Sequence, residues 1–317
     1  MHKRVALICG VSGQDGSYLA QFLLGKGYDV FGTSRDAQGS SFNNLIKLGI
    51  KERVEFLSLA PEDFRSVLEA LRKSNPDEIY FLAGQSSVGL SFEQPAETIQ
   101  SIALGTLNLL EGCRMINKNI RLYHAGSSEC FGDTHGLPAD ENTSFHPMSP
   151  YAVAKSSAYW LVNNYREAYG LFACTGILFN HESPLRPERF VTQKIIHAVK
   201  RIADGSAEKL KLGRLDISRD WGWAPEYVEA MWLMLQQDKM QDFVIATGKT
   251  ITLEEFVSTA FAQAGLDWKE HVVQDLALFR PTDLKVGRAD PSKALNQLGW
   301  KASVGGVEVV KKMYQSI

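Results

Sequence analysis

The stretch Val5-Ala6-Leu7-Ile8-Cys9-Gly10-Val11-Ser12-Gly13-Gln14-Asp15-Gly16 decides the fold of this chain. Its apolar run predicts a buried parallel strand, and the amphipathic stretch that begins near Leu19 predicts a helix. Between them lie three glycines with the spacing GxxGxxG. An ordinary strand-to-helix turn would look similar, but the matching strand and helix favour a turn whose backbone amides meet a pyrophosphate. The residues that we expect in this dinucleotide-binding turn are Gly10, Gly13, Gln14, Asp15 and Gly16.

Strand-like runs recur along the first half of the chain. They lie at residues 28–34, 54–57, 78–83 and 121–125, and helical stretches such as 64–73 separate them. This alternation predicts a parallel sheet with right-handed crossovers. We therefore expect an α/β protein with a Rossmann-type, doubly wound parallel sheet.

Arg35 follows the second of these strands. Enzymes that prefer NAD usually carry a carboxylate here for the ribose hydroxyls, whereas an arginine suits the extra phosphate of NADP. The competing interpretation is a solvated surface arginine, and Asp36 lies next to it. The sequence favours NADP as the cofactor, with Arg35 as one of its ligands.

A helix start is visible at residues 149–155. Ser149 can cap the first amides and Pro150 suits the first turn, so Tyr151 and Lys155 lie one turn apart on one helix face. Such a pair can also be a half-buried ring beside a solvated amine. An ammonium about 5 Å away, at an effective dielectric of about 20, favours a phenolate by roughly 3 kcal/mol. We expect a lowered pKa for Tyr151 and a role as a base near neutral pH.

Polar residues follow two of the predicted strands. Ser127, Ser128 and Glu129 come after the run 121–125, and the loop Gly84-Gln85-Ser86 follows the run 78–83. Open α/β sheets bind ligands at these strand ends. Taken singly, these residues could be turn caps or surface charges. Together with the tyrosine and lysine they supply the hydroxyl, acid, phenol and ammonium that carbonyl and enol chemistry needs.

The composition is that of an ordinary soluble globular protein. The chain has 317 residues, of which 44% are hydrophobic and 22% charged, and its net charge of −2 gives no general attraction to nucleic acid or membrane. The N-terminal apolar run is too short for a signal or spanning segment. Four cysteines without metal-ligand spacing predict free thiols, no metal site and a cytoplasmic location: Cys9, Cys113, Cys130 and Cys174.

The glycine turn and the tyrosine–lysine pair resemble the extended short-chain dehydrogenase/reductase superfamily. Longer matches resemble the GDP-mannose 4,6-dehydratase family within it, and the stretches 180–184 and 242–248 are the most particular to that family. The runs that carry the resemblance are Gly13–Ala20, Leu82–Ser86, Ser149–Lys155, Asn164–Gly170, Gly176–Pro184, Arg219–Gly222 and Asp242–Gly248.

The resemblance implies a mechanism and roles for four catalytic residues. Tyr151 would take the proton of the sugar 4-hydroxyl while hydride leaves C4 for NADP. Glu129 would remove the C5 proton and protonate the departing 6-hydroxyl, and the hydride would return to C6. Ser127 would hydrogen-bond O4, and Lys155 would hold the ribose and keep the tyrosine ionised. The expected reaction converts GDP-mannose to GDP-4-keto-6-deoxymannose.

Three alternatives to this reaction stay open. The chain could be a dehydratase of another GDP-sugar, such as a GDP-manno-heptose, or a GDP-sugar reductase or epimerase of the same superfamily. It could also be a cofactor-sensing scaffold without turnover, although the complete catalytic set speaks against that. Glu129 separates dehydration from plain reduction, which needs only the tyrosine–lysine pair.

The resemblance also implies the remaining ligands, each of which could instead be an ordinary surface residue. Those expected at the cofactor are Leu82, Ala83, Gln85, His181 and Arg186. Those expected at the nucleotide sugar are Ser86, Ser128, Asn180, Glu188, Lys194, Arg219 and Arg280.

Four departures from the family pattern limit the resemblance. Ser58-Leu59-Ala60 lacks the usual carboxylate to adenine, and Asp36 stands where a second arginine is common. Leu185 and Pro187 replace an arginine and a glycine. We expect a homodimer or a homotetramer.

The second half of the chain predicts a smaller α/β domain that binds substrate. A helix over 95–113 should pack on the sheet or form a subunit interface, and a helix over 221–235 should return to the cofactor domain. The expected boundaries are 1–179 with 218–248 for the NADP-binding domain, and 180–217 with 249–317 for the nucleotide-sugar domain.

Overall fold

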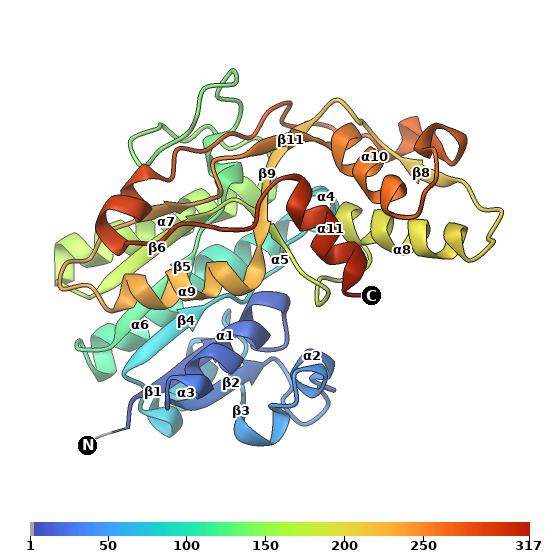
Figure 1. The fold of residues 1–317 in the computed structure, drawn as a ribbon. Helices are drawn as coiled ribbons and strands as arrows, with labels where there is room; N and C mark the ends of the chain where they lie inside the picture. The colour runs from blue at the N-terminus through green and yellow to red at the C-terminus, as the bar shows by residue number, and fades with distance from the viewer. Residues whose placement is uncertain (1–2) are drawn as a thin grey trace.

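The computed structural model describes residues 3–317 and contains a main sheet of seven parallel strands (Figure 1). The strand order is β10-β6-β5-β4-β1-β2-β3, and it reverses between β1 and β4, the point at which doubly wound folds bind ligands. The predicted fold class is confirmed. The strands are β1 Val5–Cys9, β2 Asp29–Ser34, β3 Glu55–Ser58, β4 Glu78–Phe81, β5 Arg121–Ala125, β6 Ala173–Leu178 and β10 Phe243–Ile245.

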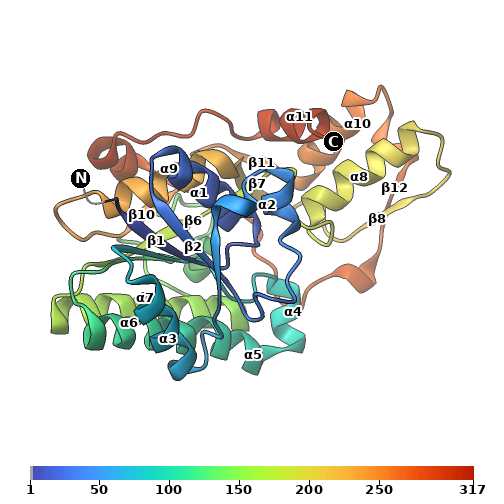
Figure 2. The ribbon, with the colours of Figure 1, turned by 90° about the horizontal axis from the view of Figure 1, so that it is seen from below.

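Helices cover both faces of this sheet (Figure 2). One face carries α1 and α9, and the other carries α3, α6 and α7. Ala6 and Ile8 of β1 enter the first core, whereas Leu7 and Cys9 enter the second, which is why the strand is apolar throughout. The helices are α1 Gln14–Gly25, α3 Phe64–Ser74, α6 Gly105–Ile116, α7 Pro150–Tyr169 and α9 Ala224–Leu235.

A smaller unit lies beside the main sheet, at the right of Figure 1. It contains a mixed sheet ordered β11-β9-β7 and a separate parallel pair, β8 and β12. Helices α8, α10 and α11 pack with the buried Trp221 and Phe256 in its core. The elements are β7 Asn180–Glu182, β8 Leu210–Leu212, β9 Ser218–Trp223, β11 Thr250–Thr252, β12 Val272–Gln274, α8 Val191–Ala203, α10 Leu253–Gln263 and α11 Val307–Gln315.

The helix predicted over 95–113 is confirmed, since the chain is helical without a break through α5 (Pro95–Ile99), a π-helical turn (Gln100–Leu104) and α6. A second helix prediction needs correction. The helix predicted over 221–235 begins only at Ala224, because residues 221–223 belong to β9 and pair with β7. Chain-distant pairing therefore overrides the local helical pattern there.

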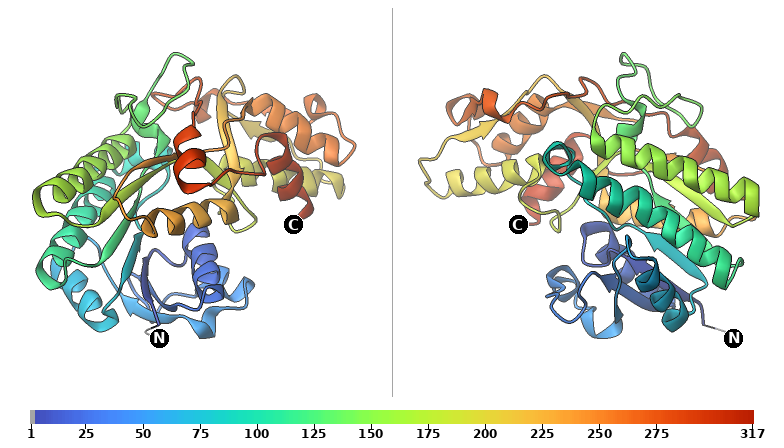
Figure 3. Two further views of the ribbon diagram at one scale, coloured as in Figure 1. Left: turned by 60° about the vertical axis from the view of Figure 1, so that its left-hand side comes forward. Right: turned by 180° about the vertical axis from the view of Figure 1, so that it is seen from behind.

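The long helices α6 and α7 run side by side behind the sheet, and the loop at 132–149 projects above it (Figure 3). Among residues 3–317, no helix is long and apolar enough to cross a membrane. The short helices are α2 Asn43–Lys47 and α4 Val88–Glu93, with 3-10 turns at Lys51–Arg53, Ser128–Phe131, Trp268–Glu270 and Leu276–Leu278 and a π-helical turn at Ala294–Leu298.

A buried ion pair ties α7 to the two strands at one end of the sheet. Asp242, just before β10, accepts two hydrogen bonds from the Arg166 guanidinium, at 3.0 and 2.8 Å, and one from the Thr175 amide of β6 at 2.7 Å. The Asp242 side chain is 7% exposed and that of Arg166 is 16% exposed. A buried pair of this kind is costly to break because one charge is left without a partner.

We expect Asp242→Asn to lower the free energy of unfolding by about 3 kcal/mol, since the Arg166 charge stays buried. Urea titration of both proteins would measure the difference. Asp216→Asn is the matched control because its ion pair with Arg214 is exposed, with side chains 55% and 42% accessible. It should lose much less stability. Equal losses in the two variants would contradict this account of the buried pair.

Candidate active site

The glycine turn joins β1 to α1 at the carboxyl edge of the sheet. Gly10 has φ +90°, and a Cβ there would lie 3.0 Å from the Ala83 backbone. A Cβ on Gly16 would lie 2.3 Å from the Gly10 carbonyl oxygen. Both positions therefore need glycine. Helix α1 starts directly after Gly13, and within the described chain no side chain caps its first amides, so its N-terminus suits an anion such as a pyrophosphate.

Gln14 and Asp15 turn their side chains toward the segment that begins with β7. The Gln14 amide donates to the His181 carbonyl at 3.2 Å and accepts from the Ser183 hydroxyl at 2.8 Å. Asp15 Oδ2 lies 2.9 Å from His181 Nε2. Three residues expected at the cofactor are thus brought together, but their side chains bind one another.

The ends of β1, β2 and β4 lie side by side, as the strand registers require. Arg35 follows β2 with a side chain that is 57% exposed and lies 3.3 Å from the Glu97 carboxylate. The Asp36 carboxylate accepts hydrogen bonds from the backbone amides of Gln38 and Gly39, each at 3.0 Å, and so caps its own loop. Gln85, after β4, donates to the Ser87 carbonyl at 2.8 Å.

The backbone of β4 continues against the glycine turn. The Leu82 amide donates to the Cys9 carbonyl at 3.0 Å, and Ala83 approaches Gly10 as described above. Ser86 is exposed in the loop before α4. The residues expected around a dinucleotide therefore gather at one edge of the sheet, and Arg186 is near enough to act electrostatically on Asp15 and His181.

The four predicted catalytic residues meet at the start of α7. Ser149 accepts from the Ala152 amide at 3.1 Å, which confirms the predicted helix cap. Lys155 donates to the Ala125 carbonyl at 2.7 Å, and its Nζ lies 5.8 Å from the centre of the Tyr151 ring. Ser127 lies close enough to Tyr151 to affect the protonation of its phenol, and Ser127 caps the 3-10 turn that carries Glu129.

Burial dominates the protonation of these groups. It raises the pKa of Tyr151, and Ser127 offsets only part of that rise. Burial also lowers the pKa of Lys155, to about 8. The predicted lowering of the Tyr151 pKa is therefore wrong for the protein alone, because the ammonium is directed to the Ala125 carbonyl and desolvation outweighs its attraction.

Glu129 is the acid of this cluster. Burial raises its pKa, while the guanidiniums of Arg219 and Arg280 act in the opposite direction and Asp283 adds to the rise. A carboxyl group with a raised pKa can give and take a proton closer to neutral pH than an exposed glutamate. The cluster therefore holds a phenol, an acid and an ammonium suited to proton transfer.

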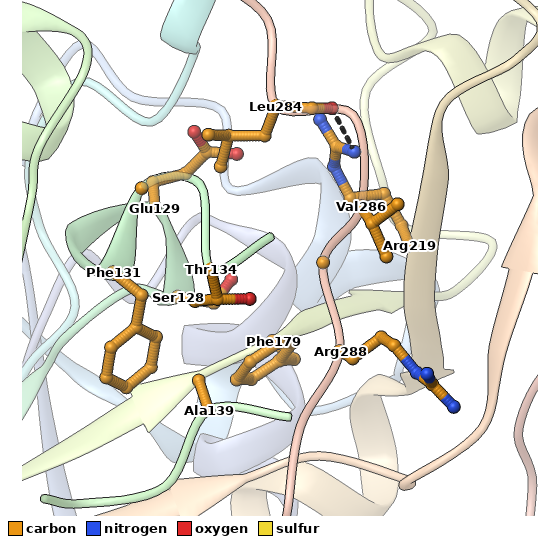
Figure 4. Close-up of a pocket in the computed structure, with 12 residues that line it drawn as sticks. Ser128, Glu129, Phe131, Thr134, Ala139, Phe179, Arg219, Leu284, Val286 and Arg288 are labelled. Carbon is orange, nitrogen blue, oxygen red and sulfur yellow. Dashed lines mark hydrogen bonds between the residues drawn. The ribbon is translucent and has the colours of Figure 1, made fainter. Parts of the chain in front are cut away.

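Glu129 lines a pocket that is built by segments far apart in the sequence (Figure 4). Ser128, Glu129 and Arg219 were predicted at the site. Sequence reasoning missed the segment 284–288 because a bridge between Ser218 and Val286, invisible in the sequence, brings it to the pocket, and it also missed Phe179 just after β6 and residues that follow Glu129. The missed lining residues are Phe131, Gly132, Thr134, Ala139, Phe179, Leu284, Val286, Gly287 and Arg288.

Two arginines share one carboxylate beside this pocket. Arg219, on β9, is buried and donates to the Leu284 carbonyl at 2.7 Å, the dashed contact in Figure 4. Its other terminal nitrogen lies 3.1 Å from Asp283 Oδ1, and Arg280 lies 3.7 Å from the same oxygen. Paired guanidiniums suit a diphosphate, which they can bind with several charge-assisted hydrogen bonds.

The other expected ligands lie around the small sheet. Asn180 begins β7 and pairs with β9. Arg186 lies 3.5 Å from the Glu182 carboxylate and stacks on the Phe190 ring at 3.9 Å. On the α8 side, Glu188 pairs with His197 at 3.5 Å and Lys194 donates to the Lys211 carbonyl at 2.7 Å. These last two contacts attach Glu188 and Lys194 to α8 and β8 rather than to the arginine pair.

The doubly wound sheet, the glycine turn after β1 and the tyrosine–lysine pair on the helix before β6 define an extended short-chain dehydrogenase/reductase. A model of the GDP-mannose 4,6 dehydratase family matches residues 7–313. The chain is 47% identical to GDP-mannose 4,6 dehydratase 1 of Arabidopsis thaliana, over 98% of this chain and 89% of that protein. The chain therefore belongs to the GDP-mannose 4,6-dehydratase family.

Two further comparisons agree with this assignment. GDP-mannose 4,6-dehydratase of Vibrio cholerae is 42% identical, over 100% of this chain and 94% of that protein. UDP-glucose 4-epimerase of Thermus thermophilus, solved in complex with NAD, superposes with a TM-score of 0.85 at 25% identity over 98% of both chains. The fold is thus shared with nucleotide-sugar enzymes of other specificity.

Proposed function

We propose that the protein is a GDP-mannose 4,6-dehydratase that forms GDP-4-keto-6-deoxymannose. The observation that carries the proposal is the placement of Glu129. Its half-buried carboxyl group lines the pocket together with Arg219 and lies in the same cluster as Tyr151. A plain reductase has no need of such an acid.

We propose NADP as the cofactor. The backbone of the Gly10–Gly16 turn and the N-terminus of α1 would hold the pyrophosphate. Arg35 would bind the 2′-phosphate, and the capping role of Asp36 in its own loop supports this because that carboxylate is engaged away from a ribose. The dinucleotide supplies a hydride acceptor that later returns the hydride, so it is not consumed.

The catalytic residues would divide the proton transfers. Tyr151 would receive the proton of the sugar 4-hydroxyl as a phenolate, after its own proton has left to solvent under the attraction of the Lys155 ammonium, and Ser127 lies beside it. Glu129, when ionised, would remove the C5 proton, which is acidic beside a 4-ketone, and would then protonate the departing 6-hydroxyl. Lys155 would hold a ribose and supply positive charge next to the tyrosine.

The nucleotide half of the substrate would lie on the small sheet. Arg219 and Arg280 would bind the diphosphate, as their shared contact with Asp283 suggests. The remaining proposed contacts are Ser86, Ser128, Asn180, Glu188 and Lys194. We assign residues 1–179 and 218–248 to the cofactor domain and the rest to the substrate domain, with two exceptions at the boundaries: β9 pairs within the small sheet, and Ala294, Leu298 and Trp300 pack in the core of the main sheet.

We also propose a homodimer or homotetramer in the cytoplasm. Large apolar side chains are exposed on the π-helical turn before α6 and on α7, which lie next to each other: Leu104 (38%), Val153 (42%) and Trp160 (62%). A partner subunit would cover them. The four cysteines are free and buried, which suits a reducing compartment.

The decisive experiment is to incubate the purified protein with GDP-mannose and catalytic NADP+ in heavy water, and to follow the nucleotide sugar by mass spectrometry. We expect the loss of one water molecule and the gain of one deuterium at C5. Glu129→Gln should stop dehydration, because the C5 proton then has no acceptor, and should leave GDP binding intact.

Other outcomes identify other enzymes. No mass change with GDP-mannose, alongside tight GDP binding, would reject this substrate in favour of another GDP-sugar. Stoichiometric consumption of NADPH would indicate a reductase, and dehydration that persists in the Glu129→Gln variant would remove Glu129 from the mechanism.

The pH dependence of kcat/KM should be bell-shaped. Glu129 must be ionised to take the C5 proton, so the acid limb should lie above the ordinary glutamate pKa of 4.5. Activity should fall as the pH rises through about 8, where Lys155 loses its charge. The residual activity of Lys155→Arg should lack this basic limb because arginine stays charged. A constant kcat/KM between about pH 7 and about pH 9 would contradict the role of Lys155.

Arg35→Gln should weaken NADP+ binding about tenfold and leave NAD+ binding unchanged, since only NADP+ carries the 2′-phosphate. Calorimetric titration with both dinucleotides measures this. Arg65→Gln is a control on α3, where Arg65 also forms an exposed ion pair, with Glu69 at 3.1 Å. It should change neither affinity. An equal loss for both dinucleotides in the Arg35 variant would argue against selection for NADP+.

A further inference from the structure

His181 is a buried, charged histidine. Its Nδ1 lies 2.7 Å from the Phe179 carbonyl oxygen, and its Nε2 lies 2.9 Å from Asp15 Oδ2. Both oxygens only accept hydrogen bonds, so both ring nitrogens must carry protons, and the ring is an imidazolium. The side chains of His181 and Asp15 are 8% and 22% exposed, so this ion pair is largely removed from water.

The residues around the pair hold both partners in place. Gln14 donates to the other Asp15 oxygen at 2.9 Å and binds Ser183, as described above. The Tyr227 ring of α9 stacks on the imidazolium at 4.4 Å between ring centres. The pair therefore has a fixed geometry and reaches from the first turn of α1 to the middle of β7.

We propose that the Asp15–His181 ion pair positions the glycine turn against β7, and so fixes the cofactor relative to the sugar. This inference rests on the proposed function, in which the turn holds a dinucleotide. Asn180, a proposed substrate ligand, precedes His181, and β7 pairs with the strand that carries Arg219. One ion pair thus joins the two halves of the site, and Asp15 and His181 act as positioning residues rather than as side-chain ligands.

The charged groups that face His181 determine how the pair responds to pH. Burial and Arg186 lower the pKa of His181, but Asp15 and the Phe179 carbonyl raise it more, so the pKa lies above the ordinary 6.5. Burial raises the pKa of Asp15, but His181, Gln14 and Arg186 lower it below the ordinary 3.8. Tyr227 faces the ring from α9 with a raised pKa and stays neutral.

These directions give the pH window of the interaction. A group with a raised pKa contributes its stability in full below its ordinary value and loses it as the pH rises through the folded value. A group with a lowered pKa contributes above its ordinary value. The ion pair therefore contributes its full stability between pH 3.8 and pH 6.5, and this stability is lost as the pH rises through the raised pKa of His181.

The test compares the full-length protein with Asp15→Asn at about pH 6 and about pH 9, by NADP+ titration and by thermal unfolding without cofactor. At pH 6 the variant should bind NADP+ at least about tenfold more weakly and should unfold at a lower temperature. At the higher pH each difference should be smaller, because His181 loses its proton as the pH rises through its raised pKa. A structural role without charge would give losses that do not depend on pH.

Two controls accompany this comparison. Asp242→Asn should lose the same stability at both pH values, because its partner Arg166 stays charged. His181→Gln removes the other partner. The double variant with Asp15→Asn should lose no more stability and NADP+ affinity than the more impaired of the two single variants, as expected for residues that act together.

The results separate this inference from the proposed function. An Asp15→Asn protein that binds NADP+ as tightly as the unmodified protein at pH 6, or that is equally impaired at both pH values, would overturn the positioning role while the dehydration assay still succeeds. An unmodified protein that binds neither NADP+ nor NAD+ would overturn the proposed function itself.

Discussion

The structure depends on one close approach of backbone to backbone, between residue 16 and the carbonyl oxygen of Gly10. A side chain at position 16 would begin 2.3 Å from that oxygen, so only glycine allows α1 to start directly where β1 ends. This start aims the N-terminus of α1 at the sheet edge and places Asp15 beside β7. The geometry of the cofactor turn and its attachment to the small sheet both follow from the same absent side chain.

Burial disfavours the charged form of each ionisable group in the catalytic cluster. It favours the neutral forms of Tyr151, Glu129 and Lys155, raising the first two pKa values and lowering the third. At neutral pH, Lys155 still carries its charge because its pKa is about 8. The charges of a nucleotide sugar and of a dinucleotide would enter a region of low dielectric, in which each added charge has a large effect on its neighbours.

Local sequence patterns predict the first five strands of the main sheet and several of the helices, because apolar periodicity, the Ser149 cap and the glycine turn are short-range features. They fail where pairing with a distant segment determines the local structure. Residues 221–223 form a strand because they pair with β7, about forty positions earlier. The same limit hid the Asp15–His181 contact, which spans 166 positions, and the wall of the pocket at 284–288. The lowered Tyr151 pKa was mispredicted because burial cannot be judged from a helix pattern.

The course of the segment 284–289 has a consequence for biosynthesis. It bridges β9 at Ser218 and the projecting loop at Ala139, and in between it forms one wall of the pocket. The core on one face of β1 also contains Ala294, Leu298 and Trp300, which lie later still in the chain. A growing polypeptide can complete neither this core nor the pocket until residues 284–300 have been synthesised, so a prematurely terminated product would lack part of both.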